Sequence, residues 1–136
     1  MSYTQEFIQM RNELIDAAAK CYSVWTNLQG QEFAWERGWL KPTEEKKYFE
    51  EKELWDTNMK ICEKLIPEIK QKFPNEVVEF AESEYERLST LIKSKTLNKY
   101  DLDDARCVRR NWSAISKGKR TPFNEFWAWA VVPDKY

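Results

Sequence analysis

Apolar side chains recur at alternating steps of four and three residues through the middle of the chain, a spacing that restricts this region to a helix. The series is Tyr48, Lys52, Trp55, Met59, Cys62, Ile66, Ile69 and Phe73. Leu54, Ile61 and Leu65 widen the apolar arc, which indicates neighbours on two sides. We therefore predict a central helix capped by Thr43 and running to Phe73. Pro67 is expected to kink or divide it, because proline removes a helical hydrogen bond.

The flanking segments have helical spacing as well. Phe7, Leu14, Cys21 and Leu28 recur every seven residues, which predicts a helix from Thr4 to Leu28 that Gly30 stops. Residues 33–39 are expected to form a short helical corner. Capping residues set the remaining boundaries: Asn75 to Lys95 for a third helix, Asp101 to Gly118 for a fourth, and Thr121 with Pro122 at the start of a short last helix.

Only three of the 136 residues are glycine, fewer than the tight turns of a sheet protein require. We therefore predict an all-α fold, a compact bundle of four main helices plus two short helices. The length fits one domain with a core of its own, so residues 1–136 are expected to form a single helical domain.

The chain contains no histidine, which removes several kinds of chemistry. A histidine general base, a Ser-His-Asp triad and a His-Cys zinc site are all excluded. Cys21, Cys62 and Cys107 form no CxxC motif and are expected to be reduced core residues. No glycine-rich phosphate loop is present either. We expect no metal, no cofactor and no enzymatic activity.

No apolar run reaches the roughly 18 residues of a membrane span, and the first thirty residues lack the pattern of a signal peptide. We expect an intracellular, cytoplasmic protein with no membrane partner.

The most asymmetric charge pattern is the basic segment "RCVRRNWSAISKGKR", residues 106–120, which holds six basic residues and no acidic one. Helical spacing places four of them on one face of the fourth helix. This face could bind nucleic acid or an acidic protein surface, or it could be a solvated face whose last cations complement the helix dipole. The basic residues are Arg106, Arg109, Arg110, Lys117, Lys119 and Arg120.

Seven tryptophans exceed what a core of this size needs. Trp39 is predicted to lie in a loop. On a helical wheel of the last helix, Phe123, Phe126 and Trp127 share an apolar arc, whereas Trp129 falls outside it beside Glu125. Trp129 is therefore expected at a margin, half-buried or anchoring a partner together with Trp39 and the basic segment.

Two acidic pairs, Glu79 with Glu82 and Asp101 with Asp104, resemble the magnesium-binding pairs of the all-α nucleotide pyrophosphohydrolases. The resemblance covers four residues and departs from the E-x-x-D pattern of that family's second pair. It would imply a magnesium-dependent nucleotide hydrolase. Glu79 and Glu82 lie opposite the apolar side of their helix, which predicts that they face solvent instead of a shared site.

Two charges interrupt apolar faces, Lys52 and Glu84. We expect Glu84 at the rim of the core with its carboxylate bent to water. The alternative is a buried carboxylate that meets a basic partner.

These features predict a small protein-binding module that acts as an adaptor, immunity partner or inhibitor. Its partner would be a larger protein with an acidic or apolar docking surface, contacted through aromatic and basic side chains. The alternative is a helical domain that binds nucleic acid through residues 106–120, and the metal-dependent hydrolase is a more remote one.

Overall fold

The computed structural model describes residues 3–132, and within them the chain forms five helices and no strand. The all-α prediction is confirmed. One short helix is present where two were predicted. The helices are α1 (Gln5–Glu36), α2 (Pro42–Lys72), α3 (Pro74–Lys93), α4 (Lys99–Ser116) and α5 (Glu125–Ala130).

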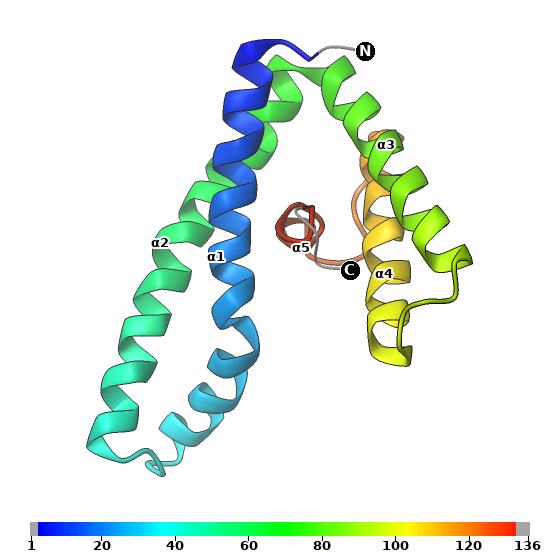
Figure 1. Cartoon of the computed structure of the whole chain (residues 1–136). Coiled ribbons are helices and arrows are strands. Elements are labelled where there is room, and N and C mark those ends of the chain that lie inside the picture. Colours follow the sequence, from blue (N-terminus) through cyan, green and yellow to red (C-terminus); the bar gives the residue numbers. More distant parts are fainter. Residues whose placement is uncertain (1–2, 133–136) are drawn as a thin grey trace.

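The four main helices form two antiparallel hairpins, α1 with α2 and α3 with α4, joined through Phe73 (Figure 1). The α1–α2 hairpin is the longer and extends beyond α3 and α4, while α5 lies between the two hairpins (Figure 1). Helix α5 therefore packs against α1 on one side and α4 on the other.

Helix α1 is capped by Thr4, whose side chain accepts a hydrogen bond from the Phe7 N–H at 3.3 Å. The Thr4 N–H donates to the Glu76 carboxylate at 2.8 Å and so ties the start of α1 to α3. The predicted stop at Gly30 is wrong, because α1 continues to Glu36. Gly38, with φ +68°, takes the left-handed conformation that ends the helix.

The prediction of a separate short helix at residues 33–39 fails for the same reason. Trp35 stacks on Tyr48 of α2 with ring centroids 5.8 Å apart, and Tyr48 is buried. This contact stabilises the turns of α1 beyond Gly30, because helices in proteins are stabilised mainly by packing.

The two glycines make a matched pair for measurement. Gly30→Ala is expected to raise the free energy of unfolding by about 0.5 to 1 kcal/mol, because a Cβ there meets open space inside a helix. Gly38→Ala should lower it by about 1 to 2 kcal/mol through its positive φ. Urea unfolding of both variants checks this, and two changes of the same sign would contradict the assigned helix end.

Helix α2 runs undivided past Pro67. It is not the central helix that its wide apolar arc predicted, because Leu54 and Ile61 are each 39% exposed. The apolar side of α2 that faces the core is the one around Cys62 and Ile69, both fully buried.

Four helix starts differ from the predictions by two or three residues. Helices α2 and α3 begin at Pro42 and Pro74, because proline suits the first helical position. The predicted caps Thr43 and Asn75 therefore lie inside the first turn. Asn98, in place of Asp101, caps α4 and accepts from the Asp101 N–H at 2.9 Å. Asn124 caps α5, after the predicted Thr121 and Pro122.

The core lies between the two hairpins and is closed by α5. All three cysteines are free, with Cys21 and Cys62 fully buried and Cys107 half-buried. Among residues 3–132, no helix has the length and apolar character needed to cross a membrane.

Candidate functional site

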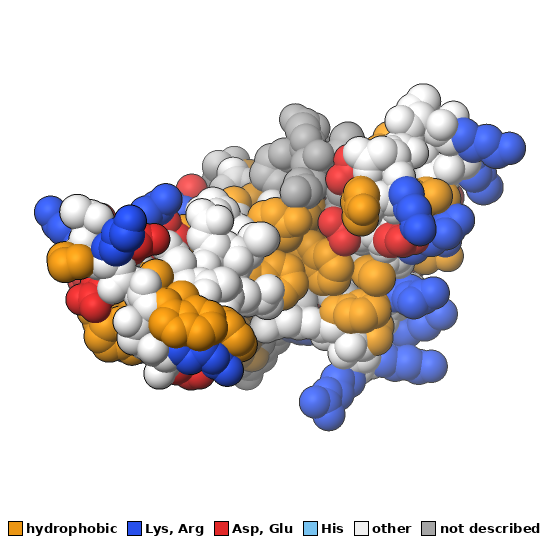
Figure 2. Space-filling view, turned by 90° about the horizontal axis from the view of Figure 1, so that it is seen from below, with side chains coloured by type: hydrophobic (Ala, Val, Ile, Leu, Met, Phe, Trp, Pro, Cys, Tyr) orange, Lys and Arg blue, Asp and Glu red, His pale blue; other side chains and the backbone are white. Residues whose placement is uncertain are grey.

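The free end of the α1–α2 hairpin carries exposed aromatic side chains, which we call the aromatic tip: Phe33, Trp35, Trp39 and Phe49, with Arg37 among them. Their exposed fractions are 51%, 39%, 65% and 47% in that order. Viewed along the hairpin from its end, hydrophobic side chains adjoin a basic one on this part of the surface (Figure 2, lower left).

The turn after α1 builds the aromatic tip. The Gly38 N–H donates to the Trp35 carbonyl at 3.0 Å, and the Trp39 N–H donates to the Ala34 carbonyl at 3.0 Å. The chain thus folds back at Gly38, and the Trp39 ring meets the Phe33 ring edge-on at 5.8 Å. Trp39 lies in a loop, as predicted.

Trp35 links this turn to the second helix. It packs edge-on against Phe49 at 4.9 Å and stacks on the buried Tyr48. The aromatic tip therefore has a buried floor, so its exposed rings are held in position by packing.

Arg37 covers one side of these rings. Its guanidinium lies 3.5 Å from the centroid of Phe33 and 5.7 Å from that of Trp39. Its Nη1 donates to the Phe33 carbonyl at 3.1 Å. An exposed guanidinium over aromatic faces is a cation-π arrangement, and tryptophan with arginine is the composition enriched in protein-binding hot spots.

The basic segment divides between surface and interior. Arg106, Arg110, Lys117, Lys119 and Arg120 are exposed. Arg109 is half-buried between the two helices of its hairpin. It lies 5.5 Å from the Tyr85 ring centroid and donates to the Ser89 hydroxyl at 3.2 Å. Arg109 thus braces α4 against α3 and does not belong to the exposed face.

Trp129 lies in the core, so the predicted position at a margin is wrong. Its side chain is fully buried, stacked on Phe80 of α3 at 5.7 Å and edge-on to Trp112 of α4 at 4.9 Å. Trp127, predicted inside the apolar arc, is the half-buried one. A fully buried side chain offers a partner no contact area, so Trp129 leaves the set of candidate binding residues.

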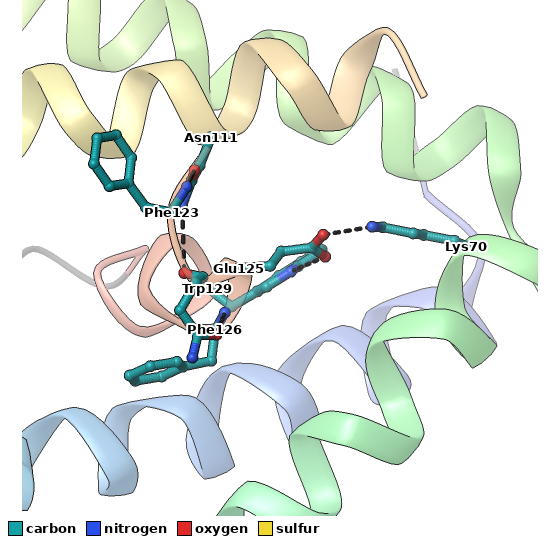
Figure 3. A network of polar contacts seen from close by, with 7 residues as sticks. Lys70, Asn111, Phe123, Glu125, Phe126 and Trp129 are labelled. Carbon is teal, nitrogen blue, oxygen red and sulfur yellow. Dashed lines mark hydrogen bonds and ion pairs between the residues drawn. The ribbon is translucent and has the colours of Figure 1, made fainter. Parts of the chain in front are cut away.

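The environment of α5 explains this reversal. The helical wheel assumed one buried side, but α5 has helices on both sides. Phe126 contacts Trp25 of α1 and Trp55 of α2, whereas Trp129 contacts the α3–α4 hairpin. Glu125, the polar neighbour on the wheel, accepts from the Trp129 Nε1 at 3.2 Å and pairs with Lys70 of α2 (Figure 3). The carboxylate therefore satisfies the indole N–H inside the core.

A buried amide holds the segment that leads into α5. Asn111 of α4 is fully buried, its Oδ1 accepts from the Phe123 N–H at 3.1 Å, and its Nδ2 donates to the Asn124 carbonyl at 3.3 Å (Figure 3). Sequence reasoning missed Asn111, although its place among the apolar residues of α4 was a visible signal.

The structure keeps Trp39 and the basic segment apart. Trp39 belongs to the loop between α1 and α2. This loop is at the lower end of the first hairpin, whereas α4 lies in the other hairpin (Figure 1). The single surface of tryptophans and arginines expected from the sequence is therefore replaced by two separate surfaces.

The two acidic pairs of the pyrophosphohydrolase resemblance do not meet. Glu79 and Glu82 share a groove with Ser113, Ser116 and Lys117 of α4. Asp104 lies twelve residues before Ser116, about 18 Å along the helix at 1.5 Å per residue. Within residues 3–132 no three metal-binding side chains cluster.

Glu84 is buried, so the predicted rim position is wrong and the alternative of a basic partner holds. Its Oε2 accepts from the Arg87 Nε at 2.8 Å, and its residue is 7% exposed. Burial raises the pKa of Glu84, and the Arg87 guanidinium opposes part of that rise. Lys52 remains exposed, 5.8 Å from the Tyr48 ring centroid.

The sequence indicated the aromatic tip only in part. The sequence indicates Trp39 as a candidate partner-binding residue, but it places Phe33 and Trp35 in a short helical corner. It does not single out Arg37 or Phe49. The signal was the pairing of Gly38 with aromatic residues on both sides, and Gly30 obscured it by suggesting an earlier helix end.

Comparisons with protein families, with curated proteins and with solved structures find no match to this chain.

Proposed function

We propose that this chain is a protein-binding module that docks through the aromatic tip into an apolar pocket bordered by carboxylates on a larger protein. The observation that carries the proposal is the exposure of Trp39 and Phe33, at 65% and 51%, beside the Arg37 guanidinium. A module of this kind can act as an adaptor, an immunity partner or an inhibitor, according to what the covered pocket does.

Three properties of the aromatic tip support docking. It lies at the end of the longer hairpin, where the remaining helices do not obstruct a partner (Figure 1). Each of its rings already contacts another, Phe33 with Trp39 and Trp35 with Phe49 and Tyr48, so binding immobilises few additional side chains. Arg37 can meet a carboxylate at the pocket rim while the rings enter the pocket.

Nucleic-acid binding through the basic segment is the second candidate. Arg106, Arg110 and Lys117 are exposed on α4 and favour contact with phosphates. On the adjoining helix, however, Glu79, Glu82 and Glu86 line the same groove as Lys117. Their charge repels a polyanion, which is why this candidate ranks second.

Trp39→Ala, alone and combined with Phe33→Ala, is expected to weaken binding at least about tenfold, as loss of a hot-spot residue does. Stability should change by less than about 1 kcal/mol, because both side chains lie on the surface. Partners captured by the wild-type chain are identified by mass spectrometry, and the affinity of each purified partner is then measured by calorimetry.

Tyr100→Ala is the matched control, since Tyr100 is an aromatic residue 82% exposed on α4, away from the aromatic tip. A partner retained by this control and lost by Trp39→Ala supports the proposal. Equal binding by all variants would exclude the aromatic tip. Binding to duplex DNA that weakens by roughly one log unit per log unit of salt for each phosphate contact would favour the second candidate.

A further inference from the structure

The outer face of the α3–α4 hairpin carries two rows of opposite charge. The acidic row is Glu79, Glu82 and Glu86 on α3, and the basic row is Arg106 and Arg110 on α4 with Lys117, the C-cap residue of that helix. Lys and Arg side chains gather on this side of the molecule, away from the aromatic tip (Figure 2, right).

The acidic row and one member of the basic row, Lys117, border a groove of about 700 Å³. Its walls include all three members of the acidic row and, from α4, Ser113, Ser116 and Lys117. Arg110 and Arg106 precede Lys117 by seven and eleven residues, and helical geometry places residues at these spacings on one side of a helix. Each row lies opposite the buried side of its own helix, which carries Phe80 and Leu88 on α3 and Val108 and Trp112 on α4, so both rows face away from the core.

The two rows do not neutralise each other within one chain. No ion pair in the described part of the chain joins a member of the acidic row to a member of the basic row. Arg109, which does contact α3, lies over the Tyr85 ring and donates to the Ser89 hydroxyl. Six charges of two signs thus remain available to an outside partner.

The antiparallel hairpin also places the rows at similar heights. The acidic row extends over eight residues, about 10 Å along α3, and the basic row over twelve, about 16 Å along the axis of α4. The shared groove sets Lys117 near the Glu79 end. Toward the other end of the hairpin the charges are reversed: α3 carries the exposed basic residue Lys93, and α4 carries the exposed acidic residue Asp103.

We propose that this face binds a second copy of the chain. A two-fold axis parallel to α3 and α4 would place the acidic row of each chain on the basic row of the other. A two-fold interface must be self-complementary, and a face with both signs in parallel rows meets this requirement, whereas a polyanion or a polycation would be repelled by one row.

The interface is largely polar, so the dimer is weak and sensitive to salt. It is independent of the proposed function, because the aromatic tip lies on the other hairpin. Dimerisation would present two aromatic tips in one particle and raise the avidity for a partner with repeated sites.

Sedimentation equilibrium of the purified chain tests the dimer. We expect self-association at about 0.01 M salt, where the Debye length is about 30 Å, and at least tenfold weaker association at about 1 M salt, where it is about 3 Å. A chain that stays monomeric at low salt would overturn the proposal, including the case in which it binds duplex DNA through the basic row.

Charge reversal identifies the surface. Glu82→Lys with Glu86→Lys, and Arg106→Glu with Arg110→Glu, should each give a monomer, because two of the three charges in one row then have the same sign as the row that they meet in the partner copy. An equimolar mixture of the two variants should form a heterodimer with affinity near that of the wild-type dimer. All four substitutions in one chain should restore the homodimer and prevent pairing with the wild-type chain.

Lys60→Glu with Lys64→Glu is the matched control, since these exposed α2 residues give the same change in charge at the same spacing as the basic-row variant. It should leave the dimer intact, and circular dichroism should report unchanged helicity for every variant. Failure of the two variants to associate when mixed, or equal disruption by the control, would refute the assigned surface.

Discussion

Replacing Trp129 with alanine is expected to lower the free energy of unfolding by about 3 to 5 kcal/mol. The side chain is fully buried and contacts Phe80 of α3 and Trp112 of α4, so its removal leaves a cavity where three helices meet. It also removes the N–H that Glu125 accepts, which leaves a half-buried carboxylate with Lys70 as its remaining partner. Chemical denaturation followed by circular dichroism measures the loss.

Two further variants separate the causes. Trp127→Ala should cost less than half as much, because Trp127 is only half-buried, with Trp25 and Phe123 as its ring contacts. Trp129→Phe keeps an aromatic ring against Phe80 but loses the hydrogen bond to Glu125, so it should cost about 1 to 2 kcal/mol. A larger loss for Trp127→Ala than for Trp129→Ala would contradict the burial of Trp129.

The second large effect is expected at Asn111. Asn111→Ala removes both hydrogen bonds that hold the segment before α5 and leaves the Phe123 N–H without its partner, while the Asn124 carbonyl keeps the hydrogen bond from the Trp127 N–H. An unpaired buried polar group costs about 1 to 3 kcal/mol and a lost hydrogen bond about 0.5 to 1.5 kcal/mol, so we expect a total loss of about 2 to 4 kcal/mol. The loss is measured as a change in the free energy of unfolding.

Asn58→Ala is the matched control, because Asn58 is also a buried asparagine in a main helix, 6% exposed. Its Nδ2 donates to the Leu54 carbonyl, one turn earlier in the same helix. That carbonyl can keep its helical hydrogen bond, so Asn58→Ala should cost less than about 1 kcal/mol. Similar losses at the two asparagines would show that the segment before α5 does not depend on Asn111.

The main helices were predictable because their signals are local. The spacing around Cys62 and Ile69 identifies α2, and Gly118, with φ +66°, ends α4 where the sequence placed its end. Cap positions were less accurate, because several residues in each turn can cap. Proline in the first turn shifted the starts of α2 and α3 to Pro42 and Pro74.

Of the two separate surfaces, the exposed basic side chains of α4 were predictable from the sequence. The exposure of the basic side chains on α4, Arg106 and Arg110 among them, follows from their helical spacing opposite Val108 and Trp112. The aromatic tip was harder to predict, because its rings come from the end of α1, the loop and the start of α2. Whether Gly30 or Gly38 ended α1 depended on Trp35 finding Tyr48 across the hairpin.

The sequence by itself determined the all-α class, the four main helices and the exclusion of histidine chemistry, since periodicity and composition are properties of the chain alone. Only the tertiary structure decided which tryptophan is buried and that Trp39 lies apart from the basic segment. A helical wheel predicts the buried side of one helix on the assumption that it packs against a single neighbour. Helix α5 is only six residues long and lies between two hairpins, so contacts from α1 on one side and from α3 and α4 on the other bury even Trp129, on the side the wheel left exposed.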